Sequence, residues 1–398
     1  MITDIHRILM TADTIGGVWT YALELALALQ AYRIDVVLAT MGDPLSDLQR
    51  LAVEKIDNLT LCESNFKLEW MDQPWNDLKA AGEWLLDLET VTRPDVVHLN
   101  GFVHGKLAWK SPTLIVGHSC IYSWFAAVKG VDTPCGWKRY AEEVSQGLRN
   151  ADLVTAPTQA MLSALQRYYG PFRTTKPIPN GRKAEEFQPR TKEPFVLSTG
   201  RLWDEAKNVA ALERIATRLS WPVYVAGVDE HRHNARTQIG NLRWLGQLSQ
   251  EYLADWLGRA SIFALPARYE PFGLCALEAG LAGCVLVLGD IPSLREVWKD
   301  TALFVPPHDE RALMHAVNSL VADEAYRRRL ADKARSRALE FTSQRMAREY
   351  VSVYNELAHN RNRQYTHHPV TLGEEESLPD RLWQPTAADV SSSEARSS

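Results

Sequence analysis

Four charged residues in the second half of the chain have types and spacings suited to binding a sugar and a diphosphate. Glu270 lies in a predicted loop, and Glu278 follows eight positions later inside a predicted helix. Carboxylates that share a site can accept hydrogen bonds from pairs of hydroxyl groups, as polyol recognition requires. Arg201 offers a planar fork and Lys207 a mobile point charge to a departing phosphate oxygen.

Glycines occur where a backbone would have to approach such a ligand. Phe272, Gly273 and Leu274 stand at the predicted helix start between the two glutamates, where free N–H groups suit anions or hydroxyl oxygens. Gly16 and Gly17 precede a helix at the first predicted strand-to-helix turn, and glycines allow close approach there. This pair lacks the G-x-G-x-x-G spacing, which argues against a nicotinamide-binding fingerprint.

The elements that must position these residues alternate between strands and helices, which predicts parallel sheets with crossover helices. Strands are expected at Arg7–Thr11, Asp35–Ala39, Val96–Leu99, Leu114–Gly117, Leu153–Ala156, Phe195–Ser198, Val223–Ala226, Ile262–Leu265 and Val285–Leu288. Helices are expected at Val18–Gln30, Trp75–Thr90, Trp137–Arg149, Gln159–Tyr168, Val209–Leu219, Gln250–Gly258, Gly273–Ala282 and Glu310–Leu320. Ligands in such folds usually bind at the carboxyl ends of the strands.

The series breaks once, at a segment rich in proline. Four prolines and a glycine between Lys176 and Pro194 predict an interdomain linker at 176–193. We therefore expect one Rossmann-like domain at 1–175 and a second at 194–340. A helix at 341–360 should return to the first domain, and the polar residues 361–398 should form a disordered tail.

Bulk composition narrows the class of protein. At 398 residues the chain exceeds a usual single core, and its net charge of −5 argues against non-specific nucleic-acid binding. Five scattered cysteines without a C-x-x-C pair predict free thiols in a reducing compartment. With no signal peptide and no apolar run of membrane-spanning length, we expect a cytoplasmic protein; peripheral membrane contact stays open.

The segment Glu270-Pro-Phe-Gly with Glu278 resembles the E-x7-E element of retaining GT-B glycosyltransferases of family four. The resemblance implies two Rossmann-like doubly wound domains facing a central cleft, with the acceptor bound in the first domain and a nucleotide-sugar donor in the second. It places Glu270 beside the donor sugar, Glu278 on the ribose hydroxyls, and the amides of Phe272, Gly273 and Leu274 on the transferred sugar.

Other segments extend the resemblance. Gly200-Arg201-Leu with Lys207 is similar to the family's G-R-L-x-x-x-K element, although Lys207 stands six positions after Arg201 instead of five. The resemblance also assigns diphosphate contacts to Gly16 and Gly17, a donor-sugar contact to His118 and a base contact to Leu248. In the linker element P-N-G-V-D, the Val-Asp pair is replaced by Arg182-Lys183.

These observations predict a retaining hexosyltransferase that uses a UDP- or GDP-sugar. The acceptor hydroxyl could belong to a carbohydrate, a lipid-linked molecule or a small molecule. Arg201 and Lys207 would stabilise the leaving diphosphate without a metal or other cofactor. A catalytically inactive GT-B-shaped protein that binds a nucleotide-sugar or a glycan is the alternative. A glycan phosphorylase would need a cofactor lysine that we cannot find, and a sugar epimerase does not explain the E-P-F-G segment.

Overall fold

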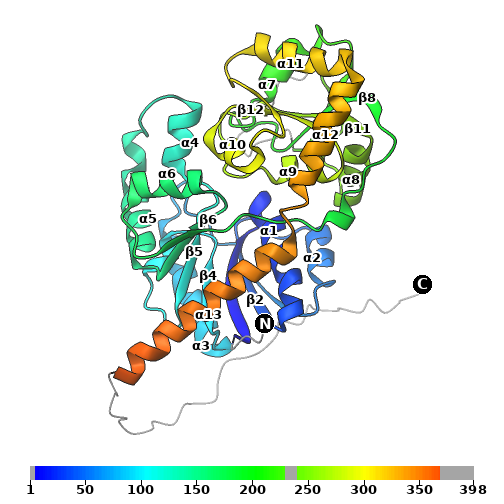
Figure 1. Ribbon diagram of the computed structural model, residues 1–398. Helices are drawn as coiled ribbons and strands as arrows, with labels where there is room; N and C mark the ends of the chain where they lie inside the picture. Colours follow the sequence, from blue (N-terminus) through cyan, green and yellow to red (C-terminus); the bar gives the residue numbers. More distant parts are fainter. Residues whose placement is uncertain (1–4, 229–239, 368–398) are drawn as a thin grey trace, which may run out of the picture.

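The computed structural model describes residues 5–228 and 240–367, which form two parallel α/β units (Figure 1). The first unit contains a seven-stranded sheet in the order β3-β2-β1-β4-β5-β6-β7, and the second a six-stranded sheet in the order β10-β9-β8-β11-β12-β13. All the strand pairs described are parallel. The prediction of two doubly wound units is confirmed.

The strands of the first sheet are β1 (Arg7–Asp13), β2 (Asp35–Met41), β3 (Leu59–Glu63), β4 (Val96–Leu99), β5 (Thr113–Val116), β6 (Leu153–Ala156) and β7 (Thr175–Pro177). Those of the second sheet are β8 (Glu193–Thr199), β9 (Val223–Ala226), β10 (Arg243–Trp244), β11 (Ala260–Leu265), β12 (Val285–Gly289) and β13 (Leu303–Val305). Central strands such as β4 and β11 are buried along their whole length. Helices cover both faces of each sheet, so these strands read as continuous apolar runs.

The helices of the first unit are α1 (Gly17–Leu29), α2 (Asp47–Val53), α3 (Trp75–Thr92), α4 (Ile121–Val128), α5 (Lys138–Asn150) and α6 (Gln159–Tyr169). Those of the second are α7 (Val209–Ala216), α8 (Gln250–Arg259), α9 (Leu274–Leu281), α10 (Pro292–Trp298), α11 (Glu310–Ala322) and α12 (Glu324–Ala338). Every strand and helix that we expected from the sequence is present, with bounds within a few residues of those expected. The sequence reading missed β3, β7, β10, β13, α2, α4, α10 and α12.

The linker that we expected at 176–193 is shorter at both ends in the structure. Lys176 and Pro177 belong to β7 and pair with β6, whereas we expected the prolines to exclude any ladder. Proline is tolerated there because β7 is an edge strand, whose outer N–H groups need no partner. At the other end, Glu193 already lies in β8.

The last helix, α13 (Ser343–His367), leaves the second unit and lies along the first (Figure 1). Tyr350 and Tyr354 pack into the same core as β1 and α1. The Tyr354 hydroxyl is 2.6 Å from Nδ1 of the buried His98 on β4. The helix runs past residue 361, where we expected the polar tail to begin, so that expectation is wrong for 361–367. The rest of the expected tail, 368–398, lies outside the described residues.

Candidate active site

The amino ends of α1 and α9, one from each unit, meet at the boundary between the units. A Cβ atom added to Gly17 would lie 3.6 Å from Cδ1 of Leu274. Both helices are preceded by a glycine at positive φ, Gly16 at 85° and Gly273 at 88°, and neither has an acidic residue in its first turn. Glycine provides no side-chain cap, so first-turn N–H groups of both helices remain available to an anion.

Arg201 lies at the same place, opposite the first unit. A Cβ atom on Gly16 would lie 3.3 Å from an Nη atom of Arg201. The side chain of Arg201 is 42% exposed, and one of its Nη atoms donates to Asp204 at 2.8 Å. Asp204 thus orients one side of the guanidinium, and the other N–H donors are left for a ligand.

The loop after Arg201 folds back on itself, which accommodates the additional residue before Lys207. Backbone N–H groups of Asp204, Lys207 and Asn208 each donate to the carbonyl three residues earlier, at 3.1, 2.9 and 3.2 Å. Asn208 adopts φ of 57°, and its side-chain amide donates to the carbonyls of Pro266 and Pro307. These turns bring the Lys207 stem beneath Gly200, whose Cβ position lies 3.6 Å from Cε.

Lys207 forms an ion pair with Glu270, so the structure brings these two site residues together. Burial opposes the charge of Lys207, but the Glu270 carboxylate, its hydrogen bond to Lys207 and the nearby Cys275 together raise the pKa of Lys207. The other carboxylate oxygen of Glu270 accepts the N–H of Gly273 at 3.0 Å. Ser293 donates to the Glu270 carbonyl at 2.5 Å. Glu270 is therefore held from three directions at the start of α9.

Glu278 lies one turn into α9 and is buried against a residue that the sequence reading did not assign. Its Oε1 is 3.0 Å from Nε of Arg182, in an ion pair that is not aligned as a hydrogen bond. Burial raises the pKa of Glu278, and the positive charge of Arg182 lowers it in part. Arg182, which stands where the linker element has Val, therefore places a cation next to Glu278.

His118 follows β5 and is anchored on the first unit. Its Nε2 lies 2.7 Å from Oδ1 of Asn100, and its ring meets that of Tyr21 edge-on at 4.6 Å. Burial lowers the pKa of His118 to about 3, so the imidazole is neutral near pH 7. If Nε2 carries the proton that this contact requires, Nδ1 is left as an acceptor for a hydroxyl group.

The resemblance also assigned ligand contacts to Phe272 and Leu248, and their side chains have surroundings different from those of Arg201 and Lys207. Phe272 is buried and meets Phe341 edge-on at 5.8 Å, so only its backbone is available to a ligand. Leu248 is half-buried in the loop before α8. The N–H of Gly227 donates to Gly246 in that loop at 2.8 Å, and a Cβ atom on Gly227 would lie 1.8 Å from the Gly200 carbonyl oxygen. The loop of Leu248 thus lies beside the strand that precedes Arg201.

Two sets of contacts, one across the boundary and one within the first unit, were not identified from the sequence. The Tyr269 hydroxyl, next to Glu270, is 2.8 Å from Oγ of Ser123 in the first unit. Oε2 of Glu69 accepts the N–H groups of Phe102 at 3.0 Å and Val103 at 2.9 Å. No motif marks these positions, because each contact joins segments that are far apart in the sequence: 146 positions for Tyr269 and Ser123, and 33 and 34 positions for Glu69 with Phe102 and Val103.

Two further features of the described residues concern metal-ligating side chains and cysteine pairing. Within 5–228 and 240–367, no three His, Cys, Asp or Glu residues are grouped so as to hold a metal ion. All five cysteines are free, as expected. No helix in the described part of the chain is long and apolar enough to cross a membrane.

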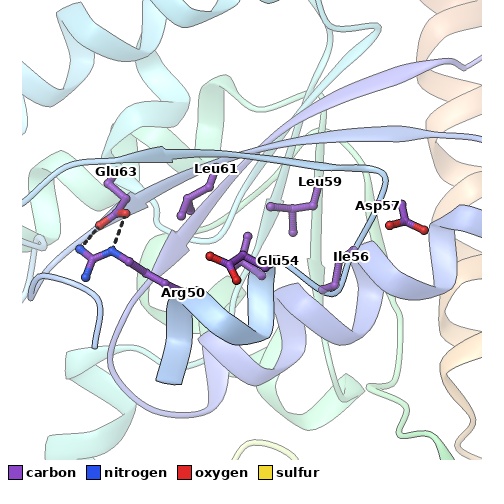
Figure 2. A pocket seen from close by; sticks show the side chains of 8 residues that line it. Arg50, Glu54, Ile56, Asp57, Leu59, Leu61 and Glu63 are labelled. Atoms are coloured by element: carbon purple, nitrogen blue, oxygen red, sulfur yellow. Dashed lines mark hydrogen bonds and ion pairs between the residues drawn. The ribbon is translucent and has the colours of Figure 1, made fainter. Parts of the chain in front are cut away.

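A shallow hollow also lies along the outer edge of the first sheet, between α2 and β3 (Figure 2). Figure 2 shows Arg50 at one end, where Nε and Nη2 donate to the two carboxylate oxygens of Glu63 at 3.0 and 2.7 Å. The remaining lining comes from Val53, Glu54, Ile56, Asp57, Leu59 and Leu61. None of these residues belongs to the group around α1 and α9.

In this protein, helix amino ends and basic side chains of two Rossmann-like units meet across the boundary between the units. This arrangement is typical of a GT-B glycosyltransferase. Comparison with known proteins agrees. The family model of glycosyl transferases group 1 matches residues 181–337, and that of glycosyltransferase family 4 matches residues 15–186. The chain belongs to this family, whose members transfer a sugar from a nucleotide-sugar.

Individual relatives are distant. The chain is 27% identical over 405 residues to a glycogen synthase of Mycobacterium tuberculosis, covering 92% of this chain and 97% of the relative. A D-inositol 3-phosphate glycosyltransferase of Nocardioides is 36% identical over 115 residues, covering 28% of this chain and 25% of the relative. Among solved structures, sucrose-phosphate synthase of Thermosynechococcus elongatus has a TM-score of 0.76 at 20% identity, covering 89% of this chain and all of that one. Anabaena HepE in complex with UDP and glucose has a TM-score of 0.70 at 15% identity, with 89% and 100% coverage.

Proposed function

We propose that this protein is a retaining hexosyltransferase that takes its sugar from a nucleotide-sugar, with UDP- or GDP-sugars as the first candidates. The observation that carries the proposal is the meeting of two uncapped helix amino ends with Arg201 and Lys207. Two helix amino ends, Arg201 with Asp204 on one side, and Lys207 paired with Glu270 come together here. The helix ends and the N–H donors of Arg201 that are not used by Asp204 suit a group that gains negative charge as it leaves, which a diphosphate does.

In the proposed reaction, the bond between the anomeric carbon and the phosphate oxygen breaks, and its electron pair leaves with the diphosphate. Arg201 and Lys207 stabilise that charge without a metal. The acceptor oxygen attacks from the face that the diphosphate leaves, and its proton passes to the departing phosphate oxygen. Retention follows because the new bond forms on the side of the old one.

The glutamates and His118 would hold the donor. Glu278 accepts the ribose hydroxyls, and the backbone from Phe272 to Leu274 holds the transferred sugar. Glu270, beside Lys207, lies next to that sugar. His118 presents Nδ1 to a sugar hydroxyl from the first unit, and the loop of Leu248 contacts the base. Contacts between the units, such as that of Tyr269 with Ser123, favour a closed arrangement that excludes water from the donor.

The test is release of nucleoside diphosphate from UDP-, GDP- and ADP-sugars in the presence of EDTA, with a panel of glucosides, sugar phosphates and lipid-linked sugars as acceptors. A transferase should release one nucleoside diphosphate and form a glycoside with the donor's anomeric configuration, assigned by NMR. A nucleotide-binding protein without turnover, the alternative, would be stabilised against heat by a nucleoside diphosphate but would release none. Neither release nor stabilisation with any donor would exclude both.

A further inference from the structure

Arg182 lies where the two chain crossings between the units touch. Its N–H donates to the carbonyl of Phe341 at 3.0 Å. A Cβ atom on the preceding Gly181 would lie 2.2 Å from the Thr342 carbonyl oxygen, so the two crossings are in backbone contact. Any change in the angle between the units has to be absorbed at or beside this point.

The Arg182 side chain connects the two units through buried carboxylates. It forms an ion pair with Glu24 of α1, and its Nε lies 3.0 Å from Glu278 of α9. The side chains of Arg182, Glu24 and Glu278 are only 4%, 5% and 9% exposed. A third carboxylate, Glu186, lies 3.8 Å away and is more exposed.

The two helices that Arg182 connects are the ones whose amino ends meet. Glu278 lies one turn inside α9 from Leu274, and Glu24 lies two turns inside α1 from Gly17. The planar guanidinium of Arg182 contacts both carboxylates at once. A lysine ammonium group lacks this forked geometry. Arg182 therefore connects α1 and α9 one to two turns behind the ends that meet.

Arg182 also determines the charge of the cluster. Burial raises the pKa of both Glu278 and Glu24, and Arg182 lowers both in part. The other ionisable groups that face Glu278 are Glu186 and the Cys275 thiol. Loss of Arg182 would leave carboxylates facing one another in a buried site, and Glu278 would be protonated at a higher pH.

We propose that Arg182 is a positioning residue for the nucleotide: through its ion pairs with Glu24 and Glu278 it holds α1 and α9 at the separation that the diphosphate and ribose require. This inference rests on the proposed function, in which Glu278 accepts the ribose hydroxyls. A sugar donor would therefore bind at a site whose geometry is set partly by the linker.

The experiment measures calorimetric binding of UDP, or of GDP or ADP if the wild type prefers one of these, at pH 6.0 and 8.5. Arg182→Lys keeps one positive charge but loses the fork, so it can pair closely with only one of the two carboxylates and the pKa of the other rises. We expect at least a tenfold loss of affinity at pH 6.0 and a smaller loss at pH 8.5. Lys183→Ala, at the neighbouring linker position, should change affinity less than twofold. A purely structural role would lower the unfolding temperature of Arg182→Lys without this dependence on pH.

The double variant Arg182→Gln with Glu278→Gln removes both buried charges and covers the case in which the single variant fails to fold. It should bind weakly at both pH values. Wild-type affinity in Arg182→Lys would overturn the inference and leave the proposed function intact. Wild-type affinity in the double variant would overturn the inference and would also remove Glu278 from the proposed ribose contact. A wild-type protein that binds no nucleoside diphosphate would overturn both.

Discussion

The carboxylate of Glu296 accepts the backbone N–H of Gln159 at 2.7 Å across the boundary between the units. Its second oxygen accepts the N–H of Ala160 at 2.8 Å. Glu296 belongs to α10 of the second unit, whereas Gln159 begins α6 of the first. A carboxylate at a helix amino end is stabilising, and here that stabilisation exists only while the units are together.

Replacing Glu296 with alanine should therefore shift the protein towards more open arrangements. A charge at a helix end contributes about 0.3–2 kcal/mol, which corresponds to a shift of roughly two- to thirtyfold in the opening equilibrium. Small-angle X-ray scattering should report a larger radius of gyration for Glu296→Ala. Asp290→Asn is the matched control, because Asp290 pairs with Arg295 within the second unit. Equal radii for wild type and Glu296→Ala would contradict the prediction.

The two glycines before α1 should respond differently to alanine. Gly16 has φ of 85°, where an L side chain is strained, and its Cβ would also press on Arg201 at 3.3 Å. Gly17 has no such φ, and its Cβ would make an ordinary contact with Leu274. We expect Gly16→Ala to lower the free energy of unfolding by about 1–2 kcal/mol and Gly17→Ala to change it by less than about 1 kcal/mol. Urea unfolding measures both, and equal effects would refute the assignment of strain to Gly16.

Much of the fold was predictable because its signals are local. Apolar runs such as Val223–Ala226 identify buried parallel strands, and their alternation with helices determines the fold class. Short or exposed elements gave no such signal: β10 has two residues, both exposed, and the proline of β7 suggested a break. The bounds of β7 depended on its position at the sheet edge, which only the tertiary structure reveals.

The arrangement of the candidate site residues was predictable where one segment carries several of them. Glu270, Gly273 and Glu278 lie on a single strand-loop-helix segment, so local sequence determines their arrangement. Arg182 could be read only as a departure from a pattern, because its partners Glu24 and Glu278 lie 158 and 96 positions away. Asn100, Glu69 and Tyr269 were missed for the same reason: each becomes important through a contact with a distant segment.

Arg201 should be needed for turnover more than for folding. Its side chain is 42% exposed and faces the meeting point of α1 and α9, so Arg201→Ala removes little packing. If it stabilises the leaving diphosphate, kcat should fall by about 10²–10³ with the unfolding temperature nearly unchanged. Arg214→Ala is the control, since Arg214 is similarly exposed and pairs with Glu310 elsewhere in the same unit. Unchanged kcat in Arg201→Ala would remove this residue from the mechanism.

Glu69 should make the stability of the protein depend on pH near neutrality. Burial raises the pKa of Glu69 to about 7, although the N–H groups of Val103 and Phe102 lower it in part. A carboxyl group with a raised pKa in the folded state binds its proton more tightly there than in the unfolded chain. The free energy of unfolding should therefore decrease as pH rises from about 4.5 to about 7. Above that range, the stabilisation that comes from the tighter binding of this proton in the folded state should be gone.

The variant Glu69→Gln tests this expectation directly. Both N–H groups donate to one oxygen, Oε2, so the glutamine carbonyl can accept them in its place. Thermal unfolding between pH 4.5 and 8 should show that the variant loses less stability than the wild type as pH rises, and that it is the more stable of the two at pH 8. Parallel curves for the two proteins would mean that Glu69 titrates at its ordinary pKa, and that its carboxylate is as well solvated in the fold as in water.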